Sequence, residues 1–404
     1  MHEQRPIIII TMLYILLAIL IYFIHLYLKS KHSIWRKRGV SGPEPIPIFG
    51  NFAAITFTLE TFPDFIWKIY KQYPEEKVVG LYQGYQPILL LKDPEIIKQI
   101  LIKDFQIFRN RGLTPSRGKI NENLFVVKDD TWKVLRQNLT PVFTSKKIKG
   151  MCPSIQKCAE NYVDAVLKLT HKQSEQEMKQ LSEKGENGVF EVEVDKELLL
   201  AQATIFYFAG VEPTSWLISY IFHELSLNQN IQNRLYGEIC KVSTKYKGKL
   251  TYDAINEMTY LDMVVNETLR KYPIATTIFR KCEADYQIPG TKTVIPKGAS
   301  ILVSIGALQN DPKFIKNPEI FNPENFAPEN KNNILRDIDM SFGDGPRNCI
   351  GMRFAIIMTK IGVAEFVKTF KLSPSPKTKL EFNIEDYSLL YSSKDGVWLH
   401  AKRR

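Results

Sequence analysis

Residues 342–351 read Phe-Gly-Asp-Gly-Pro-Arg-Asn-Cys-Ile-Gly, and the run from Met352 to Phe366 that follows has the apolar spacing of a helix. Glycine adopts positive φ and carries no side chain, so this loop can approach a flat object closely. Cys349 lies just before the predicted helix, where the partial positive charge favours a thiolate. Arg347 adds a cation that can neutralise an acidic group. The alternative is a buried structural cysteine beside an ordinary turn.

The same stretch fits the pattern F-x-x-G-x-R-x-C-x-G, and it resembles the heme-thiolate loop of the cytochrome P-450 family. The resemblance implies that Cys349 is the axial thiolate ligand of the iron of heme b. It also implies that Phe342, Arg347 and Gly351 contact the cofactor. A cysteine thiolate in this position pushes electron density toward O–O cleavage.

Two further motifs resemble parts of that family. Glu267-Thr-Leu-Arg270 matches E-x-x-R, and at i and i+3 its two charged side chains share one helix face. The resemblance implies a structural pair that locks the helix beneath the heme loop. Asn325 stands where the family has an arginine in this network, so we expect a weaker lock. Ser341 stands where a proline usually precedes the loop, and we expect only a small effect.

Trp132-Lys-Val-Leu-Arg136 matches W-x-x-x-R, whose side chains resemble donors to a heme propionate. An indole N–H and a guanidinium suit a buried carboxylate. Arg280 and Arg347 resemble further propionate partners. Three arginines against two propionates is a sensible balance of charge in a poorly solvated pocket.

The segment 208–215 reads Phe-Ala-Gly-Val-Glu-Pro-Thr-Ser and resembles the oxygen-binding helix, A-G-x-[ED]-T. Small Ala209 and Gly210 would leave room for O₂ and substrate, and Glu212 would be the acid of a proton-delivery pair. A hydrophobic core helix is the better explanation of the flanking residues, though not of the glycine and the proline inside the segment.

Pro213 stands where that family has its proton-delivering threonine. Proline has no hydroxyl and no N–H, and it removes a helical hydrogen bond. Thr214 follows one residue on, about 100° around the helix, as the remaining candidate for a catalytic hydroxyl. Loss of the hydroxyl predicts uncoupling, with peroxide released instead of product.

The N-terminal region predicts a membrane anchor. Ile7–Leu28 is a run of 22 residues without an acidic, lysine or arginine side chain, and about 33 Å of helix crosses a bilayer core of about 30 Å. A cleaved signal peptide would have a shorter apolar run and a small-residue cleavage site. Basic residues concentrate after the run, at Lys29, Lys31, Arg36, Lys37 and Arg38. The positive-inside rule then predicts that the chain after the run lies in the cytosol. The family resemblance implies that the membrane is that of the endoplasmic reticulum.

Composition is consistent with a globular protein. Of 404 residues, 44% are hydrophobic and 24% are charged, which excludes a mainly disordered or collagen-like chain. The net charge is +11, but much of it lies in the patch after the apolar run, so we expect contact with membrane lipid and none with nucleic acid. Five cysteines without a C-x-x-C pair favour a reducing compartment.

The predicted fold is mainly α with a small β component. The resemblance implies the cytochrome P-450 fold, lacking several helices of the substrate roof, plus one N-terminal transmembrane helix. We predict an anchor over residues 1–28, a basic and Pro-rich linker over 29–50, and a heme-thiolate catalytic domain over 51–404. Predicted elements are strands at 78–82, 88–91, 286–288 and 294–295, helices at 131–137, 155–169, 197–240 and 253–272, and a polar linker at 172–187.

The chain is short for this family between Trp132 and Gly210. The resemblance implies additional helices here, which form the roof of the substrate pocket, so we expect the domain to be shortened around residues 165–195. A splice variant or a faulty gene model explains this more simply than a minimal enzyme does. Ala275 and Thr276 are the remaining candidates for substrate contact.

Taken together, these motifs imply a monooxygenase that inserts one atom of O₂ into small lipophilic molecules. NADPH would supply electrons through a reductase, with a cytochrome b-type donor as a second electron source. The motifs are most similar to those of the insect microsomal, xenobiotic-oxidising branch. Two alternatives stay open: a heme-dependent peroxide isomerase or lyase, and a truncated, non-catalytic membrane protein that binds heme poorly or not at all.

Overall fold

The computed structural model describes residues 4–113, 122–169, 196–330, 335–385 and 390–404. The chain divides into two compact units. One consists of Met1–Gly112 with Thr277–Leu308, and the other of Leu113–Thr276 with Gln309–Arg404. The predicted single catalytic domain over residues 51–404 stays a prediction.

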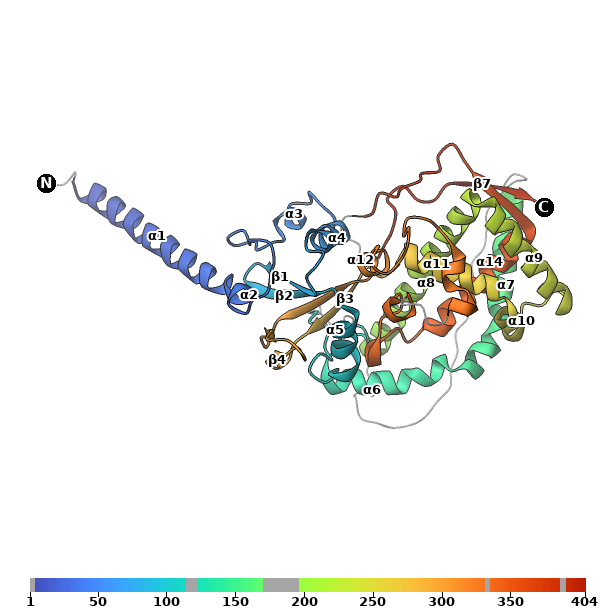
Figure 1. Cartoon of the computed structure of the whole chain (residues 1–404), viewed down its shortest axis with the longest axis horizontal. Coiled ribbons are helices and arrows are strands. Elements are labelled where there is room, and N and C mark those ends of the chain that lie inside the picture. Colours follow the sequence, from blue (N-terminus) through green and yellow to red (C-terminus); the bar gives the residue numbers. More distant parts are fainter. Residues whose placement is uncertain (1–3, 114–121, 170–195, 331–334, 386–389) are drawn as a thin grey trace. The chain divides into compact units, whose positions relative to one another are not determined.

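The first unit begins with the long helix α1, Gln4–Lys31 (Figure 1). Its stretch Met12–Lys31 is long and apolar enough to cross a membrane by length and composition, with a mean hydropathy of 2.0. Twenty residues of helix span about 30 Å, the thickness of a bilayer core. The short helix α2, Ile34–Lys37, follows directly.

A four-stranded sheet forms the centre of the first unit, in the order β1 (Val78–Gln83), β2 (Gln86–Leu91), β6 (Ser300–Ser304) and β3 (Thr277–Lys281). β1 and β2 form an antiparallel hairpin with Val78 opposite Leu91, and β2 runs parallel to β6. The first two strands lie where the apolar runs predict them, whereas β3 and β6 were not predicted. Residues of α4, Phe62–Gln72, pack with side chains of β1, β2 and β6 in one apolar core.

Other elements of this unit follow local sequence signals. Asp93 caps α5, Pro94–Lys98, by accepting hydrogen bonds from the amides of Glu95 and Ile96, and Pro94 occupies the first helical position. The remaining elements are α3 (Ala53–Thr56), the π-helical turn η1 (Gln99–Lys103), and the strand pair β4 (Tyr286–Gln287) and β5 (Val294–Ile295).

The second unit is mainly helical. Its core is formed largely by α8, α11 and α14, with side chains of α7 and α9 packed against them. Its longer elements are α6 (Asp129–Leu139), α7 (Ser145–Leu169), α8 (Lys196–Leu227), α9 (Gln229–Lys245), α10 (Tyr252–Glu257), α11 (Thr259–Lys271), α14 (Met352–Thr369) and the antiparallel strands β7 (Phe370–Pro374) and β8 (Leu399–Arg403). Short turns complete it: η3 (Thr140–Phe143), η4 (Pro323–Phe326), η5 (Pro328–Asn330), α13 (Leu335–Ile338) and η6 (Gly345–Arg347). α12 (Ile305–Gln309) spans the boundary of the two units.

Two predicted helices are each divided in two. The helix expected over 253–272 breaks at Met258, whose ψ of 78° is not helical. The carboxylate of Glu238 accepts hydrogen bonds from the amides of Tyr260 and Leu261, and so caps the second piece. The helix expected over 197–240 breaks at Asn228, whose ψ of 76° is also not helical. The polar linker predicted at 172–187 lies outside the described residues.

Candidate functional site

The glycine loop before α14 has a defined backbone shape. Gly343 and Gly345 have φ of 73° and 69°, a conformation that other residues rarely adopt. The amide of Cys349 donates to the carbonyl oxygen of Phe342 at 2.7 Å, and this hydrogen bond closes the loop. Gly351 precedes the first turn of α14. The side chain of Cys349 is exposed at the end of this closed loop.

Arg136, on α6, holds the residue next to this cysteine. Its Nη1 donates to the backbone oxygen of Asn348 and its Nη2 donates to Oδ1 of the same residue, both at 2.8 Å. Burial lowers the pKa of Arg136, and the nearby Cys349 sulfur partly offsets this effect. A cation therefore lies beside the cysteine, where it favours the thiolate.

Trp132 lies one turn before Arg136 on α6, and it is buried against Arg347 of the loop. The Arg347 guanidinium carbon lies 4.3 Å from the centre of the indole ring. Arg347 is itself buried, and its Nη2 donates to the carbonyl oxygen of Val127 at 2.9 Å. The second unit thus brings the W-x-x-x-R motif and the glycine loop together.

Arg280 lies on β3, in the first unit, and is almost completely buried. Its Nη1 donates to the backbone oxygen of Phe279, and its Nε has no hydrogen-bond partner. Within the described residues no carboxylate pairs with it. Burial lowers the pKa of Arg280 to about 10, so the guanidinium remains charged at neutral pH. A buried cation of this kind requires an anion that the described side chains do not supply.

Glu267 and Arg270 form a buried ion pair on α11. Nε of Arg270 donates to Oε2 of Glu267 at 2.9 Å, and Nη2 donates to Oε1 at 2.8 Å. The pair is 0% and 2% exposed. Arg270 also donates to Oδ1 of Asn310 at 2.8 Å, and the amide of Asn322 donates to Glu267 at 2.9 Å. The motif therefore connects α11 to two segments that precede the glycine loop.

Asn325 and Ser341, the two positions of this region that depart from the family pattern, both make hydrogen bonds. Nδ2 of Asn325 lies 3.3 Å from each carboxylate oxygen of Glu267, which is long for a hydrogen bond to a charged group. Ser341 donates from its amide and its hydroxyl to Oδ1 of Asp339, and its hydroxyl accepts from Gln309 at 3.0 Å. A proline could make none of the three Ser341 bonds, so the serine anchors the loop differently.

The candidate oxygen-binding segment lies within α8, which continues as a helix through Pro213. Ala209 is exposed, and a Cβ added at Gly210 would meet no atom within 4 Å. Glu212 is exposed whereas Thr214 is buried, so the structure does not bring the two side chains onto one face. Positions two residues apart lie about 200° around a helix, which explains the difference.

The two candidate substrate residues follow α11. Ala275 is half-buried and forms an antiparallel bridge with Leu390, while Thr276 is buried. Tyr391 donates its amide to the carbonyl oxygen of Ile274 at 2.8 Å and so fixes this segment. Two residues with clear contacts at the site were not predicted: Asn348, although it lies inside the loop motif, and Val127, a backbone partner that no side-chain pattern marks.

Comparison with known proteins defines the class of the chain. The family model described as Cytochrome P450 matches residues 40–185 and 181–399. Cytochrome P450 6B7 of Helicoverpa armigera is 31% identical over 484 residues, covering 94% of this chain and 96% of that protein. Cytochrome P450 6B1 of Papilio polyxenes is 31% identical over 498 residues, covering 97% and 100%. Cytochrome P450 3A18 of Rattus norvegicus is 31% identical over 483 residues, covering 92% and 94%.

These matches define a heme-dependent monooxygenase, an oxidoreductase whose heme iron has a cysteine thiolate ligand. The chain belongs to the cytochrome P450 family. The predicted family and its insect branch are thereby confirmed.

Features of each unit, taken separately, suit such a cofactor. In the first unit, Arg280 is a buried cation whose Nε has no hydrogen-bond partner among the described residues, and such a cation suits an acidic group. The absence of a side chain at Gly210 leaves open space beside α8. Cys349 is exposed on a loop that a neighbouring arginine holds. Heme, when bound, supplies the iron that activates O₂.

Proposed function

We propose that this protein is a microsomal monooxygenase that inserts one oxygen atom from O₂ into small lipophilic molecules. Electrons come from NADPH through a reductase, with a cytochrome b-type protein as a second donor. The observation that carries the proposal is the exposed Cys349 on a loop closed by its own amide and held by Arg136. Substrates include foreign compounds in this proposal, as the resemblance to the insect microsomal, xenobiotic-oxidising branch implies.

Each candidate residue has a proposed role. Cys349 is the axial ligand, and the residues that bind the remainder of the cofactor are Trp132, Arg136, Ala209, Gly210, Arg280, Phe342, Arg347 and Gly351. Arg136 supports this role because it both neutralises charge beside Cys349 and fixes the backbone of Asn348. Glu267 and Arg270 have a structural role, since both are buried and saturated with hydrogen bonds.

In this proposal Ala275 and Thr276 contact the substrate. Proton delivery depends on Glu212 and Thr214. The exposure of Glu212 lets it exchange protons with solvent. Thr214 is buried on a different face of α8, and Pro213 supplies no hydroxyl between them. We therefore expect slow proton delivery and a high yield of peroxide.

The proposed location is the endoplasmic reticulum membrane, with the catalytic domain in the cytosol. Residues 1–28 form the anchor, residues 29–50 the linker, and residues 51–404 the catalytic domain. The apolar stretch of α1 supports the anchor, and the lysines and arginines that follow it support the orientation.

We further propose that the substrate roof lacks several helices around residues 165–195. The alignment to the Helicoverpa protein runs over 484 residues, more than this chain possesses, and the family model matches in two pieces that meet at 181–185. α8 also carries large apolar side chains that are more than half exposed, namely Leu199, Leu200, Tyr207, Phe208 and Val211. A substrate pocket that lacks part of its roof would admit water and select substrates weakly.

The experiment is turnover of a lipophilic probe by the full chain with reductase and NADPH, measuring product and hydrogen peroxide together. We expect product to depend on NADPH, with most electrons lost as peroxide. Pro213→Thr restores a hydroxyl and should raise the ratio of product to peroxide about tenfold or more. Pro213→Ala is the matched control, because it restores only the backbone N–H, and it should leave the ratio unchanged.

Pro213 also favours a second candidate, a heme-dependent isomerase or lyase that rearranges peroxides without a reductase. Such an enzyme has no need of the hydroxyl that this position lacks. Turnover of a lipid hydroperoxide in the absence of NADPH, with no NADPH-dependent product, would favour the second candidate. Product that requires NADPH and reductase would reject it.

A further inference from the structure

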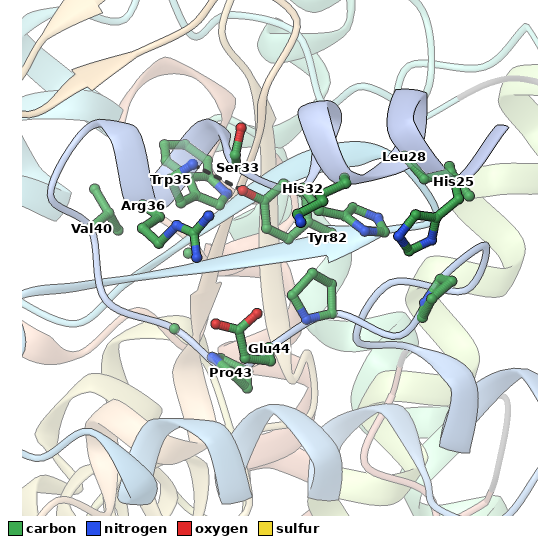
Figure 2. Close-up of a pocket in the computed structure, with 15 residues that line it drawn as sticks. His25, Leu28, His32, Ser33, Trp35, Arg36, Val40, Pro43, Glu44 and Tyr82 are labelled. Carbon is green, nitrogen blue, oxygen red and sulfur yellow. Dashed lines mark hydrogen bonds between the residues drawn. The ribbon is translucent and has the colours of Figure 1, made fainter. Parts of the chain in front are cut away.

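A pocket of about 310 Å³ lies where α1 meets the first sheet (Figure 2). His25, Leu28 and Lys29 line it from the end of α1, at a spacing that places them on one helix face, and His32 lines it from the turn that follows α1. Arg36 of α2 continues this wall. The opposite wall consists of the Pro-rich segment Gly42–Pro47, with Gly80 and Tyr82 of β1.

The backbone behind this pocket is closely packed. A Cβ added at Gly42 would lie 2.0 Å from the oxygen of Gly80, and one added at Gly80 would lie 2.5 Å from the ring of Trp35. Nε1 of Trp35 donates to the carbonyl oxygen of Leu81 at 3.0 Å, and its amide donates to the Tyr82 hydroxyl at 2.9 Å. These contacts hold α2, β1 and the Pro-rich segment together, while the charged side chains Lys29, Arg36 and Glu44 are exposed to solvent.

Charged side chains face this pocket from both walls, and within the described part of the chain no ion pair joins them to one another. Figure 2 shows the guanidinium of Arg36 and the carboxylate of Glu44 extending toward each other from opposite sides. No ion pair within the described residues involves either of them or Lys29. The pocket thus presents cations on the α1 and α2 side and one carboxylate on the Pro-rich side.

We propose that this pocket binds the phosphoethanolamine headgroup of a membrane lipid. Lys29 and Arg36 would bind the phosphate, and Glu44 would accept hydrogen bonds from the ammonium group. A zwitterion matches the charges on both walls, whereas a purely anionic headgroup would leave its second charge facing Glu44. The proposal rests on the anchor proposed above, because the pocket begins within the last two turns of the apolar helix, at the depth of lipid headgroups.

The test uses the full chain in nanodiscs made of equal parts phosphatidylcholine, phosphatidylethanolamine and phosphatidylglycerol, the last of which is anionic and has no amine. Native mass spectrometry then identifies the lipid retained by each chain. We expect phosphatidylethanolamine to be enriched, and Arg36→Gln or Glu44→Gln to reduce the enrichment about tenfold, as loss of a hydrogen bond between charged groups predicts. Lys37→Gln is the matched control: it removes a neighbouring cation that does not line the pocket, and the enrichment should remain.

Other outcomes would overturn the proposal. Enrichment of phosphatidylglycerol, or equal losses in the Arg36 and Lys37 variants, would mean that general surface charge attracts the lipid. Displacement by inorganic phosphate as readily as by glycerophosphoethanolamine would mean that the amine is not recognised. Incorporation of the chain without lipid selectivity would contradict this proposal alone, whereas a chain that does not incorporate would contradict the anchor as well.

Discussion

Arg136 and Asn348 are joined by two hydrogen bonds of 2.8 Å across 212 positions of sequence. Asn348 immediately precedes Cys349, so this contact sets the position of the loop end. A double-mutant cycle with Arg136→Met and Asn348→Ala removes the side-chain bond. We expect a coupling energy of about 1–2 kcal/mol in the free energy of unfolding, measured in urea. Lys133→Met, on the exposed side of the same helix, is the control, and additive effects would contradict the contact.

The Glu267–Arg270 pair should matter far more to stability than an exposed pair does. Glu267→Ala leaves a buried guanidinium without its carboxylate, and we expect a loss of about 3–5 kcal/mol. Lys149 and Asp253 form an ion pair of 2.7 Å whose side chains are 57% and 58% exposed. Breaking that pair with Lys149→Gln should leave the free energy of unfolding nearly unchanged, because solvent screens an exposed pair. Equal losses of Tm in the two variants would show that burial is not the cause.

Arg280 should have opposite effects on the chain with and without cofactor. Burial lowers the pKa of Arg280 to about 10, below the ordinary pKa of an arginine, so its charge destabilises the fold at every pH below about 10. This destabilisation declines only as the pH rises from there toward the ordinary pKa of an arginine. Arg280→Met should therefore leave the heme-free chain equally or more stable, while heme dissociates about tenfold faster because a propionate loses its partner.

Thermal unfolding of the heme-free chain and the rate of heme transfer to apomyoglobin measure the two effects of Arg280→Met. A fall in both stability and heme retention would indicate that Arg280 serves only the fold. Unchanged heme transfer would remove it from the propionate partners.

His223 should make the fold sensitive to acid. Burial lowers its pKa below the ordinary 6.5, with Lys271 contributing and Glu224 opposing, and its Nε2 is buried without a hydrogen-bond partner. As the pH falls, His223 is protonated in the unfolded chain before it is protonated in the folded chain. The free energy of unfolding therefore falls as the pH drops from about 6.5 toward the lower pKa of His223 in the folded chain. His223→Gln should reduce this slope in a series of Tm measurements, whereas the exposed His400→Gln should not. Identical slopes in all three proteins would contradict the assignment.

Local patterns predicted the elements that local chemistry determines. Short apolar runs predicted β1 and β2, and Asp93 and Pro94 mark the start of α5, because strands and helix caps depend on neighbouring residues. The break at Met258 could not be predicted in this way. It depends on the carboxylate of Glu238, which belongs to another helix and reaches the amides only in the folded chain.

The candidate site shows the same division. Spacing within a motif anticipated the Glu267–Arg270 pair, since i and i+3 meet on any helix. The choice of Asn348 as partner for Arg136 follows from how α6 meets the loop, which no pattern within either motif contains. The hydrogen bonds of Ser341 were also missed, because comparison with proline suggested a loss and not a new network with Asp339 and Gln309.

The central claim is that Cys349 is the thiolate ligand of a heme iron, and carbon monoxide tests it most directly. The full chain is expressed with heme, reduced, exposed to carbon monoxide, and its Soret band recorded. We predict a red-shifted band typical of a thiolate ligand, which Cys349→Ala abolishes while Cys158→Ala, at another exposed cysteine, leaves it unchanged. A band at the position of a neutral ligand in the unaltered chain, or a thiolate band that survives Cys349→Ala, would contradict the account.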